Sequence, residues 1–382
     1  MHYSTIISLD IPEIENEDLE INEQIKGTIK DIERKIKNGD DNVMLQIMLE
    51  DYKGLTTTFA REVSGKAEYK LERYCENTEN PEYLEFVDMT EDLTYEYNNG
   101  CISTCFKFPN GLIHNRYSPE FYQKFCFEDG KVYQSNYGPG KSKRRTKKSK
   151  RIQVLNDYPI NKIYKTFDDY VINYCGYQFY EEHNAYGYYC NPEGKFDWYQ
   201  IGGRWPELFL VKEGCSDYSY GSRSWCNDDH FVEAPKGYKW VCAARIKDIQ
   251  WKAMYDRAFE KYKDAYDKLK VWFEEGTVPE NDDHYEISEK GISSYCSMVY
   301  KSGQSFDDFL RDRGFIVGMK YPLNIYSFLD DNEGWFDCEQ VRCADDTHSF
   351  EIIKDEEWYK SVEKFISSLD DDTVLVGIDI HN

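Results

Sequence analysis

Hydrophobic and polar positions predict strands at both ends of the chain. Residues 2–9 alternate and are rich in Ile, Ser and Thr, which is typical of a β-strand. Residues 373–380 form an apolar run that predicts a second terminal strand. Further strands are predicted at 83–88, 102–108, 207–212, 239–246, 315–320, 323–329 and 335–341. The chain is therefore expected to begin and end in a sheet.

Apolar residues between these strands recur every three or four positions, which is the helical period. The clearest case is 248–275, predicted as one long amphipathic helix in which Trp, Met, Ala, Tyr and Leu recur between charged residues. Isoleucines with the same spacing predict a helical insert within 13–79. Shorter helices are predicted at 166–176, 305–313 and 355–369.

The order of these elements indicates the fold class. Strands and helices are mixed without a regular β-α-β repeat, and no Gly-x-Gly-x-x-Gly sequence occurs. We therefore expect an α+β fold with a largely antiparallel or mixed sheet that contains both terminal strands. Because the chain begins and ends in sheet strands, a single elaborated domain, 1–382, with helical inserts is predicted.

Composition narrows the class of protein. The chain has 382 residues and a formal net charge of −24, which excludes a protein that coats duplex nucleic acid through a generally basic surface. Aromatic residues make up 16%, enough for a substantial core. The sequence contains neither a secretory signal nor an apolar stretch of about 18 residues. It predicts a cytoplasmic protein without a membrane partner.

One segment has the opposite charge. Residues 141–151, KSKRRTKKSKR, hold eight basic residues in eleven, so that the rest of the chain carries −32. They belong to a basic, flexible loop predicted at 138–152. A solvated loop, a contact with a phosphate backbone and a nuclear-import patch all fit this composition, and the sequence does not decide among them.

The most unusual segment is Asn191–Trp205, which contains the sequence D-W-Y-Q-I-G-G-R-W. Adjacent glycines let a backbone adopt positive φ or approach another group closely. Two tryptophans and a tyrosine supply flat faces beside one cation, Arg204, which can stack on them while it grips a carboxylate or phosphate. The segment predicts a pocket for a nucleotide, a base or an acidic side chain. Its predicted ligand-binding residues are Asp197, Trp198, Tyr199, Gly202, Gly203, Arg204 and Trp205.

A purely structural interpretation of the same segment is open. In it, Arg204 pairs with Asp197 inside the protein, the tryptophans close a corner of the core, and the glycines form a bulge. The two interpretations differ in whether the Arg204 guanidinium faces outward or is sealed inside.

The last predicted strand ends in a second candidate group. Asp379 and His381 are two residues apart and therefore share a face of that strand. His2 would lie beside them if the two terminal strands are neighbours. A His-Asp-His set suits a mononuclear metal ion and an Asp-His pair suits acid–base catalysis, so these three residues are the catalytic and metal-ligand candidates. Simple solvation of the histidines is the alternative.

With these residues in view, the chain resembles a family of uncharacterised proteins carried by bacteriophages and some bacteria. The resemblance covers most of the chain, and the D-W-Y-x-I-G-G-R-W core is its most specific part. Its anchors are His2–Tyr3, Glu85–Asp92 with the turn Pro109–Gly111, Asn191–Trp205 and Asp370–His381. The helical insert, the basic loop and residues 320–333 depart from the family pattern. The resemblance implies a phage or mobile-element setting and no particular chemistry.

Three functions are compatible with these features. The first is a phage-associated accessory protein that binds a nucleotide, nucleic acid or host defence component through the aromatic and arginine pocket. The second is an acidic protein that imitates nucleic acid and inhibits a host protein. The third is a metal-assisted or acid–base hydrolase that uses His2, Asp379 and His381, with Arg204 holding an anionic group. Because no recognised catalytic motif occurs, the first is preferred, without a cofactor; a divalent metal ion belongs only to the third. The oligomeric state stays open.

Overall fold

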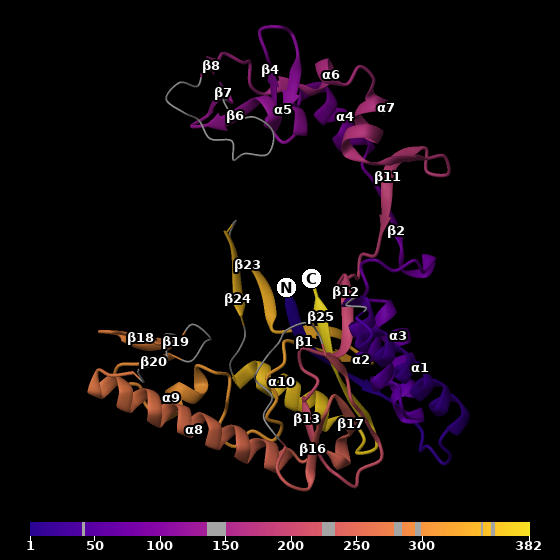
Figure 1. Ribbon diagram of the computed structural model, residues 1–382, viewed down its shortest axis with the longest axis vertical. Helices are drawn as coiled ribbons and strands as arrows, with labels where there is room; N and C mark the ends of the chain where they lie inside the picture. The colour runs from indigo at the N-terminus through magenta and orange to yellow at the C-terminus, as the bar shows by residue number, and fades with distance from the viewer. Residues whose placement is uncertain are drawn as a thin grey trace. The chain divides into compact units, whose positions relative to one another are not determined.

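The computed structural model describes residues 1–39, 43–135, 150–223, 234–278, 285–294, 299–344, 347–352 and 356–382. Contacts divide the chain into two compact units, unit 1 (Met1–Glu76 and Glu193–Asn382) and unit 2 (Asn77–Pro192). The sequence predicts one domain with inserts; in the structure, unit 2 is an insertion between two parts of unit 1 (Figure 1). The basic loop predicted at 138–152 lies outside the described residues except for 150–152.

Unit 1 is built on a mixed sheet in the order β14-β17-β25-β1-β21-β22, and β12 also pairs with β25. Its strands are β1 (His2–Leu9), β12 (Trp198–Gly203), β14 (Tyr218–Ser219), β15 (Ser222–Arg223), β17 (Ala243–Arg245), β21 (Ser327–Asp330), β22 (Gly334–Asp337) and β25 (Val374–His381). Strand β1 is antiparallel to β25 and parallel to β21. The predicted α+β fold, with both terminal strands in one sheet, is confirmed.

The other elements of unit 1 surround this sheet. The helices are α1 (Leu19–Lys37), α2 (Val43–Gly54), α3 (Thr58–Glu72), α8 (Trp251–Glu275), α9 (Phe306–Arg311), α10 (Glu356–Ser367) and the 3₁₀ turn η3 (Ile246–Asp248). The additional strands are β13 (Phe209–Lys212), β16 (Tyr238–Val241), β18 (Tyr285–Ser288), β19 (Gly291–Ser294), β20 (Val299–Lys301), β23 (Glu339–Ala344) and β24 (Thr347–Ile352). Three helices thus lie in the described part of the segment 13–79, and α8 covers 251–275 of the predicted 248–275. Within the described residues, no helix is long and apolar enough to cross a membrane.

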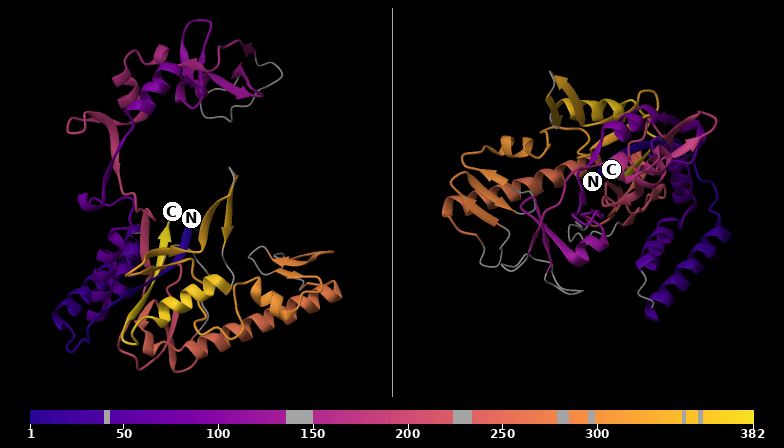
Figure 2. Two further views of the ribbon diagram at one scale, coloured as in Figure 1. Left: turned by 180° about the vertical axis from the view of Figure 1, so that it is seen from behind. Right: turned by 90° about the horizontal axis from the view of Figure 1, so that it is seen from above.

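Alternation along β25 explains how the sheet is covered (Figure 2). Ile378 packs on one face against Phe59 and Val63 of α3. Leu375 packs on the opposite face against Phe365 of α10. Since successive side chains of a strand point to opposite faces, one central strand contributes to two cores. Burial of each such side chain stabilises the fold by about 2–3 kcal/mol.

The prediction of a strand at 315–320 is wrong. Gly314 and Gly318 have φ values of 66° and 83°, so the backbone turns twice within this short segment. Phe315 and Met319 are buried beside Phe259 of α8. The apolar residues that suggested a strand therefore lie in a turn and pack against α8. The local sequence pattern alone does not distinguish such a turn from a strand.

Unit 2 contains small sheets and short helices. Its strands are β2 (Glu85–Asp88), β3 (Cys101–Ile102), β4 (Cys105–Lys107), β5 (Ile113–Asn115), β6 (Phe125–Glu128), β7 (Lys131–Gln134), β8 (Arg151–Ile152), β9 (Tyr158–Pro159), β10 (Gln178–Tyr180) and β11 (Ala185–Cys190). Its helices are η1 (Pro81–Tyr83), α4 (Thr90–Asn99), α5 (Pro119–Lys124), α6 (Ile160–Ile163), α7 (Phe167–Tyr170) and the π-helical turn η2 (Val171–Cys175). One core gathers around Leu93 and Tyr170, and a second around Phe106 and Phe121. Unit 2 therefore has apolar cores of its own.

The points at which the chain leaves unit 1 for unit 2 and returns from it are joined by backbone hydrogen bonds. The Glu76 N–H donates to the Phe196 carbonyl and the Lys195 N–H donates to the Tyr74 carbonyl, each at 2.8 Å. We therefore expect a chain in which a short Gly/Ser linker replaces 77–192 to keep unit 1 folded, with its free energy of unfolding changed by about 1 kcal/mol or less. Chemical denaturation followed by circular dichroism measures this. Loss of a cooperative transition would contradict it.

Candidate functional site

Three strands bring the two groups of candidate residues onto one face. On β25, His381 lies opposite His2 of β1 on one side and opposite Trp198 of β12 on the other. Asp379 lies opposite Ser4 of β1 in the next row on that face. Figure 1 shows the two termini side by side at this end of the sheet. The two terminal strands are therefore neighbours, which is the condition for His2, Asp379 and His381 to form one group.

Asp379 connects three parts of the site. Its side chain is fully buried. Oδ1 lies 2.9 Å from His2 Nδ1, and Oδ2 accepts a hydrogen bond of 3.0 Å from the Arg204 backbone N–H. Because a carboxylate only accepts hydrogen bonds, His2 Nδ1–H is the donor. One buried carboxylate therefore fixes the imidazole of the first strand and the backbone after the two glycines.

The glycine pair makes this contact possible. A Cβ atom on Gly203 would lie 2.3 Å from Asp379 Cβ and 2.5 Å from Oδ2. A Cβ atom on Gly202 would lie 2.7 Å from the Gly221 Cα. Both residues have positive φ, 78° and 51°, and the Trp205 N–H closes the turn on the Gly202 carbonyl. Glycine is required here both for space and for backbone conformation.

A second carboxylate–imidazole pair lies beside the first. Asp197 Oδ1 is 2.7 Å from His381 Nδ1, and the two side chains are 42% and 40% exposed. The His381 carbonyl also accepts a hydrogen bond from the Asp197 N–H. The rings of His381 and His2 meet edge to face, with centroids 4.9 Å apart. Two Asp–His pairs, one with a buried carboxylate and one at the surface, therefore lie next to each other.

Arg204 faces outward. Its backbone is held by Asp379, whereas its side chain is exposed. Among the residues that the structure describes, none forms a hydrogen bond or an ion pair with its guanidinium. Trp198 is 44% exposed, and its ring lies edge to face with His2 at 5.8 Å. The sealed Arg204–Asp197 pair of the structural interpretation is not found in these residues.

Tyr199 does not belong to this face. It alternates with Trp198 along β12, and it packs against Phe196 on the opposite side of the sheet. Burial there raises the pKa of its hydroxyl to about 12. Of the other predicted pocket residues, Gly202 and Gly203 shape the turn and Trp205 follows it, half-buried. The exposed candidates are thus Asp197, Trp198 and Arg204.

Comparisons with known proteins add no template for this arrangement. No protein-family model, curated protein or solved structure matches the chain. The resemblance to phage-borne proteins therefore stays a prediction, and its functional consequences have to be argued from the geometry of the site.

This geometry suits orientation of imidazoles more than metal binding. Within the described residues, no three His, Cys, Asp or Glu side chains are arranged to hold a metal ion. Each carboxylate instead holds the Nδ1–H of one histidine, which leaves Nε2 for another partner. Carboxylate-held imidazoles of this kind serve as general acids and bases. His2, Asp379 and His381 come together, but as parts of two hydrogen-bonded pairs.

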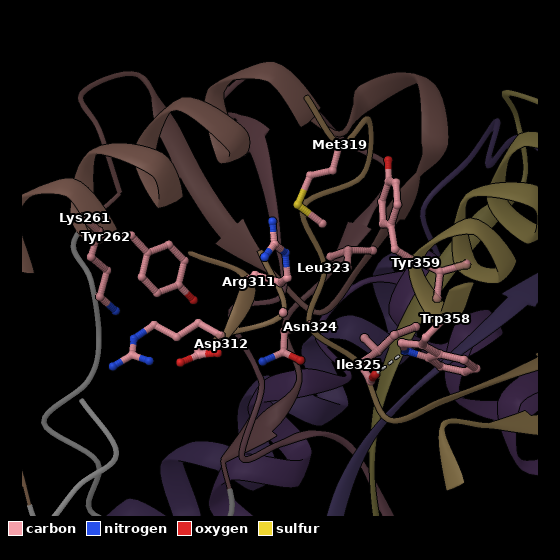
Figure 3. Close-up of a pocket in the computed structure, with 13 residues that line it drawn as sticks. Lys261, Tyr262, Arg311, Asp312, Met319, Leu323, Asn324, Ile325, Trp358 and Tyr359 are labelled. Carbon is pink, nitrogen blue, oxygen red and sulfur yellow. Dashed lines mark hydrogen bonds between the residues drawn. The ribbon is translucent and has the colours of Figure 1, made fainter. Parts of the chain in front are cut away.

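A cavity of about 590 Å³ is lined by residues of α8, α9, α10 and the segment 319–325 (Figure 3). Its cationic side chains are Lys261 of α8, Arg311 of α9 and Arg313, which follows α9, and Trp358 of α10 forms part of its apolar wall. Asn324 lines the cavity, and its carbonyl accepts a hydrogen bond of 3.3 Å from the Ser4 hydroxyl. The cavity is therefore linked to the row that contains Asp379. No local pattern predicts it, because its lining is assembled from distant segments.

Proposed function

We propose that the face formed by His2, Trp198, Arg204 and His381 binds a nucleotide unit, either free or within a single strand. The observation that carries this proposal is the combination of a fixed Arg204 backbone with an exposed guanidinium that has no described partner. Such a side chain extends from a fixed point of the backbone, and its guanidinium is available to grip a phosphate with two parallel hydrogen bonds.

The aromatic side chains support a ligand with a planar ring. Trp198 offers an exposed face, and His2 and His381 continue the same row of rings. Stacking of one base on an aromatic side chain contributes about 1–3 kcal/mol to binding. A phosphate on Arg204 and a base on Trp198 match the two chemical parts of a nucleotide.

The overall charge restricts the kind of ligand. A net charge of −24 repels a long polyanion, so binding has to depend on short-range contacts with few phosphates. We infer a single-stranded segment or a free nucleotide rather than a duplex. In the phage or mobile-element setting of the predicted resemblance, the protein would act as an accessory factor in the host cytoplasm.

Binding of a fluorescently labelled, single-stranded oligonucleotide of mixed sequence tests this proposal. Arg204→Ala and Trp198→Ala should each weaken binding by about tenfold or more, because each removes a charged hydrogen bond or a stacking surface. Fluorescence anisotropy gives the Kd, and circular dichroism shows whether each variant is folded.

Arg34→Ala is the matched control, since Arg34 is an exposed arginine of α1 that pairs with Asp31. It should leave the Kd unchanged. Equal affinities for Arg204→Ala and the unaltered protein would refute the proposal. Unfolding of both site variants would instead support the structural interpretation of the segment.

A further inference from the structure

The two Asp–His pairs offer more than a binding surface. His2 and His381 come from neighbouring strands, and each has its Nδ1 hydrogen-bonded to a different carboxylate. In the described parts of the chain, neither Nε2 atom has a hydrogen-bond partner. Two neighbouring imidazoles with fixed orientation and available Nε2 atoms can act on two oxygen atoms of one reacting group, one as base and one as acid.

The two Asp–His pairs differ in their exposure to solvent. Asp379 is fully buried and its second oxygen is occupied by the Arg204 N–H, whereas Asp197 and His381 are both about 40% exposed. Two imidazoles of the same chemical type therefore have different surroundings, because one is held by a buried carboxylate and the other by an exposed one. The Arg204 backbone is bonded to the same Asp379, and its exposed guanidinium is available to stabilise negative charge that develops on a phosphoryl group.

We propose that His2 and His381 form a metal-independent acid–base pair that cleaves single-stranded RNA at a phosphodiester bound by Arg204. This inference rests on the proposed nucleotide binding. The inference extends the proposed function by naming RNA as the substrate. RNA carries its own nucleophile, the 2′-hydroxyl, next to the phosphorus atom. An adjacent nucleophile replaces a bound metal hydroxide and gives a high effective concentration.

The reaction is balanced without a co-reactant. The 2′-oxygen forms a bond to phosphorus, and its proton passes to Nε2 of the unprotonated histidine. The bond from phosphorus to the 5′-oxygen breaks, and that oxygen takes a proton from the protonated histidine. The products are a 2′,3′-cyclic phosphate and a 5′-hydroxyl end. Asp379 and Asp197 are positioning residues, because they act through the imidazoles.

The test uses the full-length protein and three end-labelled oligonucleotides of one sequence: RNA, DNA and 2′-O-methyl RNA. Cleavage of the RNA alone, in the presence of EDTA and with a cyclic phosphate at the new end, is expected. Neither analogue has a free 2′-hydroxyl, so both should bind without cleavage. The rate should show a bell-shaped dependence on pH, because the reaction needs one imidazole protonated and the other unprotonated.

Variants separate the roles of the residues. His381→Ala and His2→Gln should each lower the cleavage rate by about a hundredfold or more while 2′-O-methyl RNA still binds. Asp197→Asn should lower kcat by about tenfold or more with little change in KM and alter the pH profile. His183→Ala is the matched control, because His183 belongs to unit 2 and contacts Phe86 and Tyr189. It should cleave at the unaltered rate.

The outcomes distinguish this inference from the proposed function. Binding of 2′-O-methyl RNA without cleavage of RNA would overturn the inference and leave nucleotide binding in place. Absence of both would overturn both. Cleavage that EDTA abolishes, that extends to DNA, or that persists in His381→Ala and His2→Gln would also overturn the inference.

Discussion

Replacing Gly203 by alanine will lower the free energy of unfolding of unit 1 by roughly 3 kcal/mol and abolish ligand binding. The added Cβ would lie 2.3 Å from the Asp379 side chain, which is fully buried between neighbouring strands and cannot move aside cheaply. The residue also has a φ of 51°, a region that alanine adopts only with strain. Chemical denaturation and oligonucleotide anisotropy measure the two effects.

Gly214→Ala provides the control for this substitution. Gly214 has open space around the position of a Cβ atom, so the added methyl group meets nothing. Its replacement should change the free energy of unfolding by about 0.5 kcal/mol or less. If Gly203→Ala were as stable and bound as tightly as Gly214→Ala, the contact between the glycine turn and Asp379 could not be the feature that builds the site.

Asp379→Asn has the second large effect, a loss of roughly 2–4 kcal/mol in the free energy of unfolding. The carboxylate accepts from His2 through one oxygen and from the Arg204 N–H through the other. An amide of the same shape has only one acceptor and points its own N–H₂ group at the second donor. If the amide oxygen faces the Arg204 N–H, His2 can keep a hydrogen bond only by accepting from the amide at Nδ1, with its proton moved to Nε2. The change therefore removes the buried negative charge and both of its charge-assisted hydrogen bonds.

The control for Asp379→Asn is the same change at the surface. Asp197→Asn alters a carboxylate that also bonds to a histidine but is 42% exposed, so water can replace the lost interaction. Its free energy of unfolding should fall by about 1 kcal/mol or less. Denaturation curves that rank Asp197→Asn as the more damaging change would refute the role of Asp379 as the buried centre of the site.

The sequence predicts the elements of unit 1 better than their arrangement. Alternation and helical spacing identify β1, β25 and α8, because each buries one regular face. The apolar residues of 315–320 mislead, since Gly314 and Gly318 turn the chain while Phe315 still packs on α8. The compactness of unit 2 has no local signal, because it depends on contacts between residues far apart in the sequence.

For the candidate site too, the sequence predicts the parts better than their arrangement. The residues themselves are identifiable from their chemistry, but the pairing of Asp197 with His381 and of Asp379 with His2 depends on strand register, which no local pattern specifies. One part of the outcome was available from the sequence. Because side chains alternate along a strand, Trp198 and Tyr199 cannot face the same ligand.

The position of β25 in the sheet affects when the protein can fold during synthesis. This strand pairs with β1, β12 and β17. Those three strands are synthesised earlier, and they cannot complete the sheet until β25 has left the ribosome. Until residues 374–381 emerge, the apolar faces of those partners are uncovered and available to chaperones or to aggregation. The last described strand thus sets the moment at which the nascent chain gains both its core and its paired histidines.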